Sequence, residues 1–227
     1  MNEVPSIKHT STKFNEEIED IRQSVFQMAG LIEKQTQRAI QALMDYDANL
    51  ADKLIEREVS IDELESKIDQ MCVETIAKRQ PTAFDLRFLI AVAKITTDLE
   101  RIGDEAEDMG GYLIKMKRKK SAKFHSDLST LGKIVMEMMN QSFDSFARLD
   151  DSLARKAISK ELKLQKEFDR VMRVLVTYMM EDPRTIKAAL KVAWCARSLE
   201  RIGKHCSNVC EYIVYLVEGK DIRHQQD

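Results

Sequence analysis

The residues best suited to chemistry in this sequence are acidic side chains spaced at helical intervals. Glu100, Asp104 and either Glu107 or Asp108 follow one another in steps of four and then three or four. Residues at these spacings share one face of a helix, where their like charges repel. A bound cation would turn that repulsion into ligation, because carboxylates suit divalent and trivalent ions.

A second acidic row lies in the preceding helical segment, at Glu58, Asp62, Glu65 and Asp69. If the two helices are antiparallel neighbours, the two acidic faces can meet between them. The candidate metal ligands are therefore Glu100, Asp104, Asp108 and Asp62. The alternative is an ordinary solvated face, balanced by the nearby cations Arg101, Lys94 and Lys67.

The corresponding row in the second half of the chain is interrupted. Lys204 stands four residues after Glu200, where the first half has Asp104 after Glu100. Glu200 and Lys204 form a favourable i to i+4 pair instead. Glu200 is therefore a doubtful metal ligand.

Other constellations give little support for catalysis or for zinc. None of the four histidines has a glutamate three residues before it, as a ferritin-like di-iron site requires. His205, Cys206 and Cys210 have the elements of a zinc site, but Cys206 lies on the apolar stripe and His205 points elsewhere. No glycine-rich phosphate loop, paired nucleophile and base, or His-Glu-x-x-His motif occurs. We therefore do not expect the protein to be an enzyme.

The apolar periodicity predicts long amphipathic helices. Residues 14–43 repeat apolar side chains in steps of four and three, with a gap at Gln35. A second helix is expected over 48–79, ended by Pro81, and a third over 82–117. The second half repeats this plan over 124–149, 152–180 and a last helix to 217, after a break at Asp182 and Pro183, where Asp182 is a plausible N-cap.

An internal repeat fixes the domain organisation. Leu-Glu-Arg-Ile-Gly at 99–103 recurs at 199–203, and the surrounding apolar positions match at the same offset. A basic run at 117–120 marks the expected boundary. The prediction is an all-α chain of two similar three-helix bundles with long antiparallel helices, at 1–120 and 121–227.

Composition agrees with this fold and bears on location. The chain has 227 residues, 7 glycines, 3 prolines and a formal net charge of −2, so no nucleic-acid partner is expected. No signal peptide or membrane span is apparent, which predicts a soluble cytoplasmic protein with its four cysteines as buried thiols. We expect the methionines, Met180 among them, and Trp194 to be packing residues. The alternative is a partner groove for the methionines and a binding anchor for Trp194.

Several motifs resemble those of the PhoU family of phosphate-transport regulators. They are AKRQPTAFDLR at 77–87, DLERIGD at 98–104, YMMED at 178–182 and CARSLERIG at 195–203. The resemblance extends over nearly the whole chain.

This resemblance implies a function that the residues alone do not give. It implies a homodimeric regulator of phosphate uptake that keeps the phosphate-starvation response off when phosphate is plentiful. Its partners would be the ATPase subunit of the phosphate-specific ABC transporter and a phosphate-sensing histidine kinase, so any membrane association would be through them. The family's Glu/Asp-x-x-x-Asp motifs hold iron or zinc in some members; Glu100 and Asp104 keep that motif. The alternative is a metal-binding helical protein with a secondary regulatory role.

Overall fold

The computed structural model describes residues 12–45, 61–114 and 125–223, and every regular element within these ranges is helical. The predicted all-α fold is confirmed. The elements are α1 (Thr12–Asp45), α3 (Ile61–Arg79), α4 (Ala83–Ile114), α6 (His125–Arg148), α7 (Asp151–Ile158), α8 (Glu161–Glu181), a 3₁₀ turn (Pro183–Thr185) and α9 (Ile186–Glu218). No helix in the described ranges is long and apolar enough to cross a membrane.

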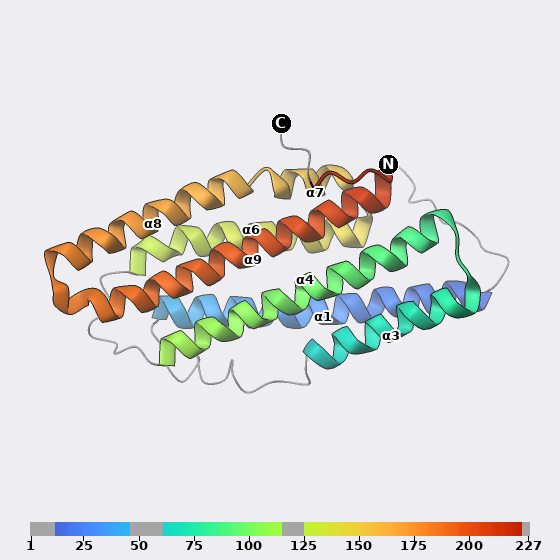
Figure 1. Cartoon of the computed structure of the whole chain (residues 1–227), viewed down its shortest axis with the longest axis horizontal. Helices are drawn as coiled ribbons and strands as arrows, with labels where there is room; N and C mark the ends of the chain where they lie inside the picture. Colours follow the sequence, from blue (N-terminus) through green and yellow to red (C-terminus); the bar gives the residue numbers. More distant parts are fainter. Residues whose placement is uncertain (1–11, 46–60, 115–124, 224–227) are drawn as a thin grey trace.

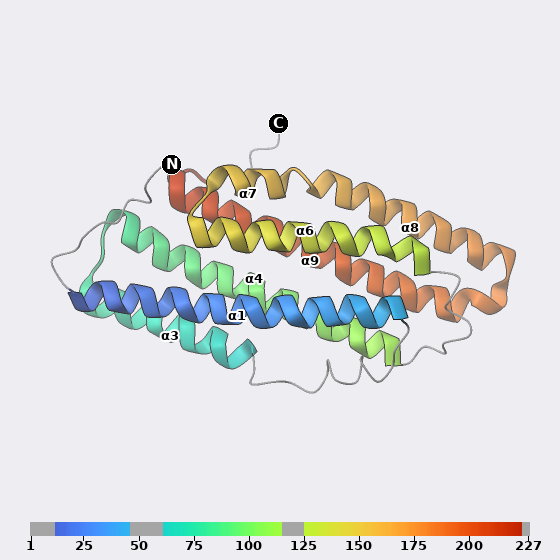
Figure 2. The same ribbon diagram turned by 180° about the vertical axis from the view of Figure 1, so that it is seen from behind.

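The helices form two groups that lie along one another (Figure 1). In the first group α1, α3 and α4 contact each other, and in the second α9 contacts α6, α7 and α8. The most extensive contact among the described elements joins the groups, between α4 and α9. The view from behind shows α1 and α6 covering the opposite face (Figure 2).

The predicted seam of the first helix is its buried face. Ile21, Val25, Met28 and Ile32 are almost completely buried and recur in steps of four, three and four. Because these side chains leave water on the same side, they hold α1 against α3 and α4.

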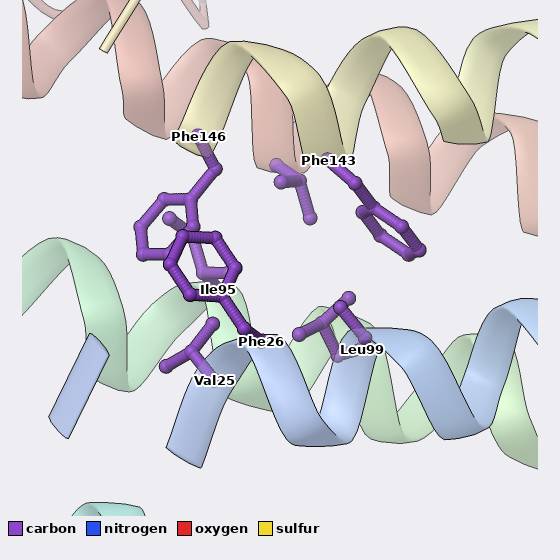
Figure 3. Close-up of a pocket in the computed structure, with 8 residues that line it drawn as sticks. Val25, Phe26, Ile95, Leu99, Phe143 and Phe146 are labelled. Carbon is purple, nitrogen blue, oxygen red and sulfur yellow. The ribbon is translucent and has the colours of Figure 1, made fainter. Parts of the chain in front are cut away.

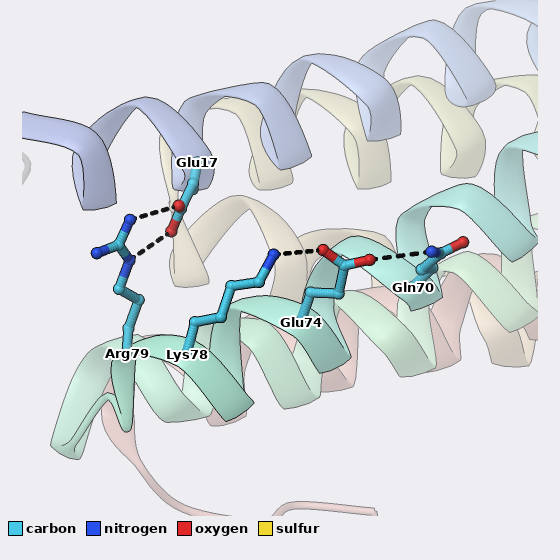
Figure 4. A network of polar contacts seen from close by, with 5 residues as sticks. All are labelled: Glu17, Gln70, Glu74, Lys78 and Arg79. Atoms are coloured by element: carbon cyan, nitrogen blue, oxygen red, sulfur yellow. Dashed lines mark hydrogen bonds and ion pairs between the residues drawn. The ribbon is translucent and has the colours of Figure 1, made fainter.

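Proline ends α3 as expected. The helix stops at Arg79, Gln80 adopts a φ of 48°, and Pro81 follows. Arg79 forms a bidentate ion pair with Glu17 of α1, with contacts of 2.9 and 2.7 Å (Figure 4). The same figure shows Glu74 bonded to Lys78 and Gln70 on α3 itself.

The single helix predicted over 152–180 is wrong in one respect, because it is divided into α7 and α8. Near the break, the Ser159 hydroxyl donates to the carbonyl of Lys156, and the Lys160 N–H donates to Ala157, three residues back. A side chain that competes for backbone groups in this way interrupts a helix. At the next break Asp182 accepts from the N–H of Arg184, as an N-cap does, and Pro183 follows it in the 3₁₀ turn.

The two groups also meet behind the α4–α9 contact, where α1 approaches α6. A small apolar pocket lies there, lined by residues of α1, α4, α6 and α9 (Figure 3). Phe26 and Phe146 meet edge to face, with ring centroids 5.6 Å apart. Aromatic packing therefore closes the junction on this side.

Some predictions fall outside the described residues. These are the start of the second helix at residue 48, the acidic residue Glu58, and the basic run at 117–120. The division at residue 120 therefore stays a prediction.

The repeated glycines mark the closest approaches inside each half. A Cβ at Gly103 would lie 3.0 Å from the Cδ1 of Ile61, and one at Gly203 would lie 2.3 Å from the Cδ2 of Leu164. Each glycine thus lets the neighbouring helix pack directly against the backbone.

Gly203→Ala should destabilise the protein by about 1–2 kcal/mol, because the overpacking of buried Leu164 outweighs the higher helix propensity of alanine. Thermal unfolding measures this as a fall in Tm of roughly 2–8 °C. Gly30→Ala on α1 is the control, since no atom lies within 4 Å of its Cβ position, and it should leave Tm unchanged or raise it. A Gly203→Ala protein as stable as the parent would contradict the close packing.

Candidate cation site between α3 and α4

The antiparallel packing of α3 and α4 brings the two acidic rows together. Ile61 packs against Gly103, and Glu65 forms a side-chain hydrogen bond with Thr97. Glu100 forms a side-chain hydrogen bond with Asp104, one turn along α4. The charges of Glu65 and Asp62 also act on Glu100. The predicted convergence of acidic side chains from two helices is therefore present.

Glu100 has the most perturbed carboxyl of this group. Burial raises its pKa from 4.5 to about 7, and the charges of Asp104, Glu65 and Asp62 add to the increase. The uptake of a proton lets this carboxyl donate its hydrogen bond to Asp104. At pH 8 the same carboxyl is charged, among three like charges, and a cation would relieve that repulsion.

Asp108 lies one helical turn beyond Asp104 on α4. Burial raises the pKa of its carboxyl, as do the charges of Glu105 and Asp104, while Arg201 opposes them. Arg201 pairs with Glu105 at 2.9 Å, so Asp108 is influenced by the contact with α9. Glu65, which we did not choose as a ligand, is electrostatically coupled to Glu100 instead.

The donor chemistry of the acidic group fits a hard cation, since carboxylate oxygens are the ligands such ions prefer. Within the described residues, however, no three His, Cys, Asp or Glu side chains are arranged to hold a metal ion. The group is therefore a region of negative charge, and its side chains would have to draw together around an ion.

The second half has a different arrangement at the equivalent position. Glu200 is only 1% exposed, and its two carboxylate oxygens pair with Lys204 at 2.6 Å and Arg197 at 2.9 Å. The predicted pair of Glu200 with Lys204 is present, whereas the contribution of Arg197 was missed. The Arg197 guanidinium also lies 5.7 Å from the ring centre of Phe168.

A buried polar contact between the halves was also missed. The Asp98 carboxylate accepts from the amide of Asn208 at 3.0 Å and lies 2.6 Å from Nδ1 of His205. His205 is therefore engaged by Asp98, and Cys206 is buried in the core, as its place on the apolar stripe predicted. All four cysteines are buried free thiols, as expected.

Two residues expected to be packed inside are exposed. Met180 is 80% exposed and Trp194 is 55% exposed, although Trp194 stacks on Tyr112 of α4 with centroids 6.2 Å apart. Helical periodicity cannot show that α8 and α9 extend beyond their neighbours at this end. Met138 and Met139 are buried as predicted.

The equivalent substitutions Glu100→Gln and Glu200→Gln should change stability in opposite directions at pH 8. Glu100→Gln removes a charge from an acidic group and should raise Tm by about 2–4 °C, corresponding to ~1 kcal/mol. Glu200→Gln removes the partner of two cations and should lower Tm.

The pH dependence has a definite sign. Between about pH 4.5 and 7 the folded state holds a proton on Glu100 that the unfolded chain releases, so this carboxyl contributes less stability as pH rises. The Tm difference between Glu100→Gln and the parent should therefore grow across this window. Differential scanning fluorimetry at several pH values measures it, and a constant difference would contradict the raised pKa.

Comparisons with known proteins identify the family. The family model of the PhoU domain matches residues 25–113 and 128–213. The phosphate-specific transport system accessory protein PhoU of Escherichia coli is 41% identical over 217 residues, which cover 96% of this chain and 90% of that protein. The PhoU homolog of Pseudomonas aeruginosa is 42% identical over 217 residues, covering 95% and 90%.

Solved structures agree with this assignment. The crystal structure of PhoU from Pseudomonas aeruginosa superposes with a TM-score of 0.88 at 41% identity, covering 91% of this chain and 100% of that one. PhoU from Streptococcus pneumoniae shares the fold, with a TM-score of 0.85 at 24% identity, covering 92% and 98%. With a matching domain in each half, extensive identity and a common fold, this chain belongs to the PhoU family.

Proposed function

We propose that this protein is a regulatory adaptor of phosphate-specific transport. It restrains phosphate uptake and keeps the phosphate-starvation response off when phosphate is plentiful. Its partners are the ATPase subunit of the phosphate ABC transporter and a phosphate-sensing histidine kinase. It acts as a homodimer in the cytoplasm.

The observation that carries this proposal is the family relationship over almost the full chain. The relatives from Escherichia coli and Pseudomonas aeruginosa are named as accessory proteins of the phosphate-specific transport system. The shared length covers both repeats, so the whole architecture of those relatives is available here. An accessory protein needs surfaces for partners rather than a catalytic centre.

The end of the molecule formed by α8 and α9 offers such a surface. It projects beyond α1, α4 and α6 in both views (Figures 1 and 2). Exposed apolar side chains gather on the two helices near this end: Val176, Met180, Ile186, Leu190 and Trp194. Exposed apolar clusters with an aromatic anchor are typical of protein contacts.

A deletion strain tests the regulatory proposal. Without the protein, phosphate-starvation genes should stay expressed in rich phosphate, as measured with a phosphate-regulated phosphatase, and the intact gene should restore repression. Trp194→Ala should restore it poorly, whereas Val73→Ala, which changes an exposed valine on α3, should restore it fully. Repression that persists in the deletion strain would refute the regulatory role. Full restoration by Trp194→Ala would refute only the proposed contact surface.

We further propose that the acidic group between α3 and α4 binds a cation, with iron or zinc as the family's candidates. Glu100, Asp104 and Asp62 would supply oxygen ligands, with Glu65 beside them. The bound ion would supply positive charge that neutralises this group. The support is the raised pKa of Glu100 together with the convergence of the two rows. A cation-binding protein with a secondary regulatory role remains the alternative function.

Replacing both Glu100 and Asp104 by alanine should abolish most stoichiometric metal binding, whereas Glu200→Ala should change it little. The reason is that Glu200 is already paired with two cationic side chains. Isothermal titration with Fe²⁺ or Zn²⁺ on protein purified without an affinity tag measures this. Unchanged binding in the double variant would remove the proposed site.

A further inference from the structure

The two halves of the molecule can be compared position by position. Gly103 packs against Ile61 of α3, and Gly203 packs against Leu164 of α8. These two contacts are therefore equivalent, and they fix the alignment of α3 with α8. The positions one, four and eight residues after Ile61 are acidic, namely Asp62, Glu65 and Asp69. The positions one, four and eight residues after Leu164 are uncharged, namely Gln165, Phe168 and Met172.

The helices α4 and α9 also differ in charge: α9 has cations at two positions where α4 has a neutral and an acidic residue. The internal repeat aligns Thr97 with Arg197 and Asp104 with Lys204, on either side of the paired residues Glu100 and Glu200. The second half thus lacks the carboxylates that surround Glu100 in the first and has two cations beside its own glutamate. A single buried carboxylate remains there, with two positive partners.

The Glu200 carboxylate is buried between its two cationic partners. Both oxygens of Glu200 are buried and form ion pairs without hydrogen-bond geometry, one with the Lys204 ammonium at 2.6 Å and the other with the Arg197 guanidinium at 2.9 Å. Arg197 is held in turn over the Phe168 ring. A buried carboxylate is costly unless it is paired, and these two side chains supply that pairing from within the chain.

We propose that the Lys204 ammonium, supported by Arg197, is a permanent built-in cation of the second half and replaces a bound metal ion at Glu200. The first half keeps an acidic group that a free cation can neutralise, whereas the second half is neutralised by covalently attached charges. The structure of the second half is therefore independent of metal. The statement that a free cation neutralises the first half rests on the cation site proposed above, whereas the role of Lys204 does not.

Exchange of the equivalent residues tests this in the full chain. Arg197→Thr with Lys204→Asp gives α9 the residues that α4 has at these two positions, and Thr97→Arg with Asp104→Lys makes the reverse exchange on α4. With chelator present, the first pair of changes should lower Tm by roughly 4 °C or more, and added Mn²⁺ should restore part of the loss. The reverse pair should raise Tm in chelator and remove any stabilisation by Mn²⁺.

Two controls separate this role from a general charge effect. Lys187→Asp alters another exposed lysine of α9, for which no ion pair is found in the described part of the chain, and Tm should not fall, because a carboxylate in the first turn of a helix is favourable. Lys204→Arg keeps the cation and should retain most of the stability.

Three outcomes would overturn the proposal. The first is a Tm for Arg197→Thr with Lys204→Asp equal to that of Lys187→Asp in chelator. The second is a loss of stability that Mn²⁺ does not reverse, which would make the pair an ordinary salt bridge. The third is Mn²⁺ bound to the parent chain at Glu200, detected as binding that survives Glu100→Ala with Asp104→Ala. A parent chain that binds no Mn²⁺ would refute the site in the first half, and the Tm of the exchanged second half would still decide the role of Lys204.

Discussion

The packing of α4 against α9 is the contact on which the rest of the molecule depends. Each of these helices carries one copy of the repeated Leu-Glu-Arg-Ile-Gly motif, and together they join the two groups along the long axis. At their centre Asp98 of α4 is buried and bonded to His205 and Asn208 of α9. A shift of one helix along the other would leave this carboxylate without partners, at the cost of an unpaired buried charge. The register of the two halves is therefore specified by polar as well as apolar contacts.

The same contact shows how the repeat is used. Lys94 lies 5.6 Å from the ring centre of Tyr212, and Tyr112 stacks on Trp194. The repeat relates Lys94 to Trp194 and Tyr112 to Tyr212, so the two contacts occupy equivalent places in the two halves. The apolar framework is thus nearly symmetric, whereas the side chains at its surface differ. One end of the seam has a cation beside an aromatic ring, and the other has a stacked aromatic pair of which Trp194 is exposed.

Electrostatics distinguishes the halves where packing does not. The glutamate of the repeated motif is fixed by the fold in both, but its surroundings depend on which residues the neighbouring helix contributes. At Glu100 these are further acids, and the pKa of the carboxyl is raised. At Glu200 they are uncharged, and the cations of its own helix complete the site. The same position of the repeat therefore has two different electrostatic surroundings.

The sequence alone determined most of the helices, the breaks at Pro81 and Pro183, the repeat and the acidic rows, because these follow from local periodicity and backbone chemistry. The division of residues 152–180 into α7 and α8 was not predicted. Which members of the rows converge, how Arg197 pairs with Glu200, and which apolar residues remain exposed required the tertiary structure. Trp194 illustrates the reason: its spacing fits a helix, but its exposure depends on where the neighbouring helices end. Likewise, the position of Asp108 near Arg201 follows from the packing of α4 on α9, a contact between residues far apart in the chain that no local pattern encodes.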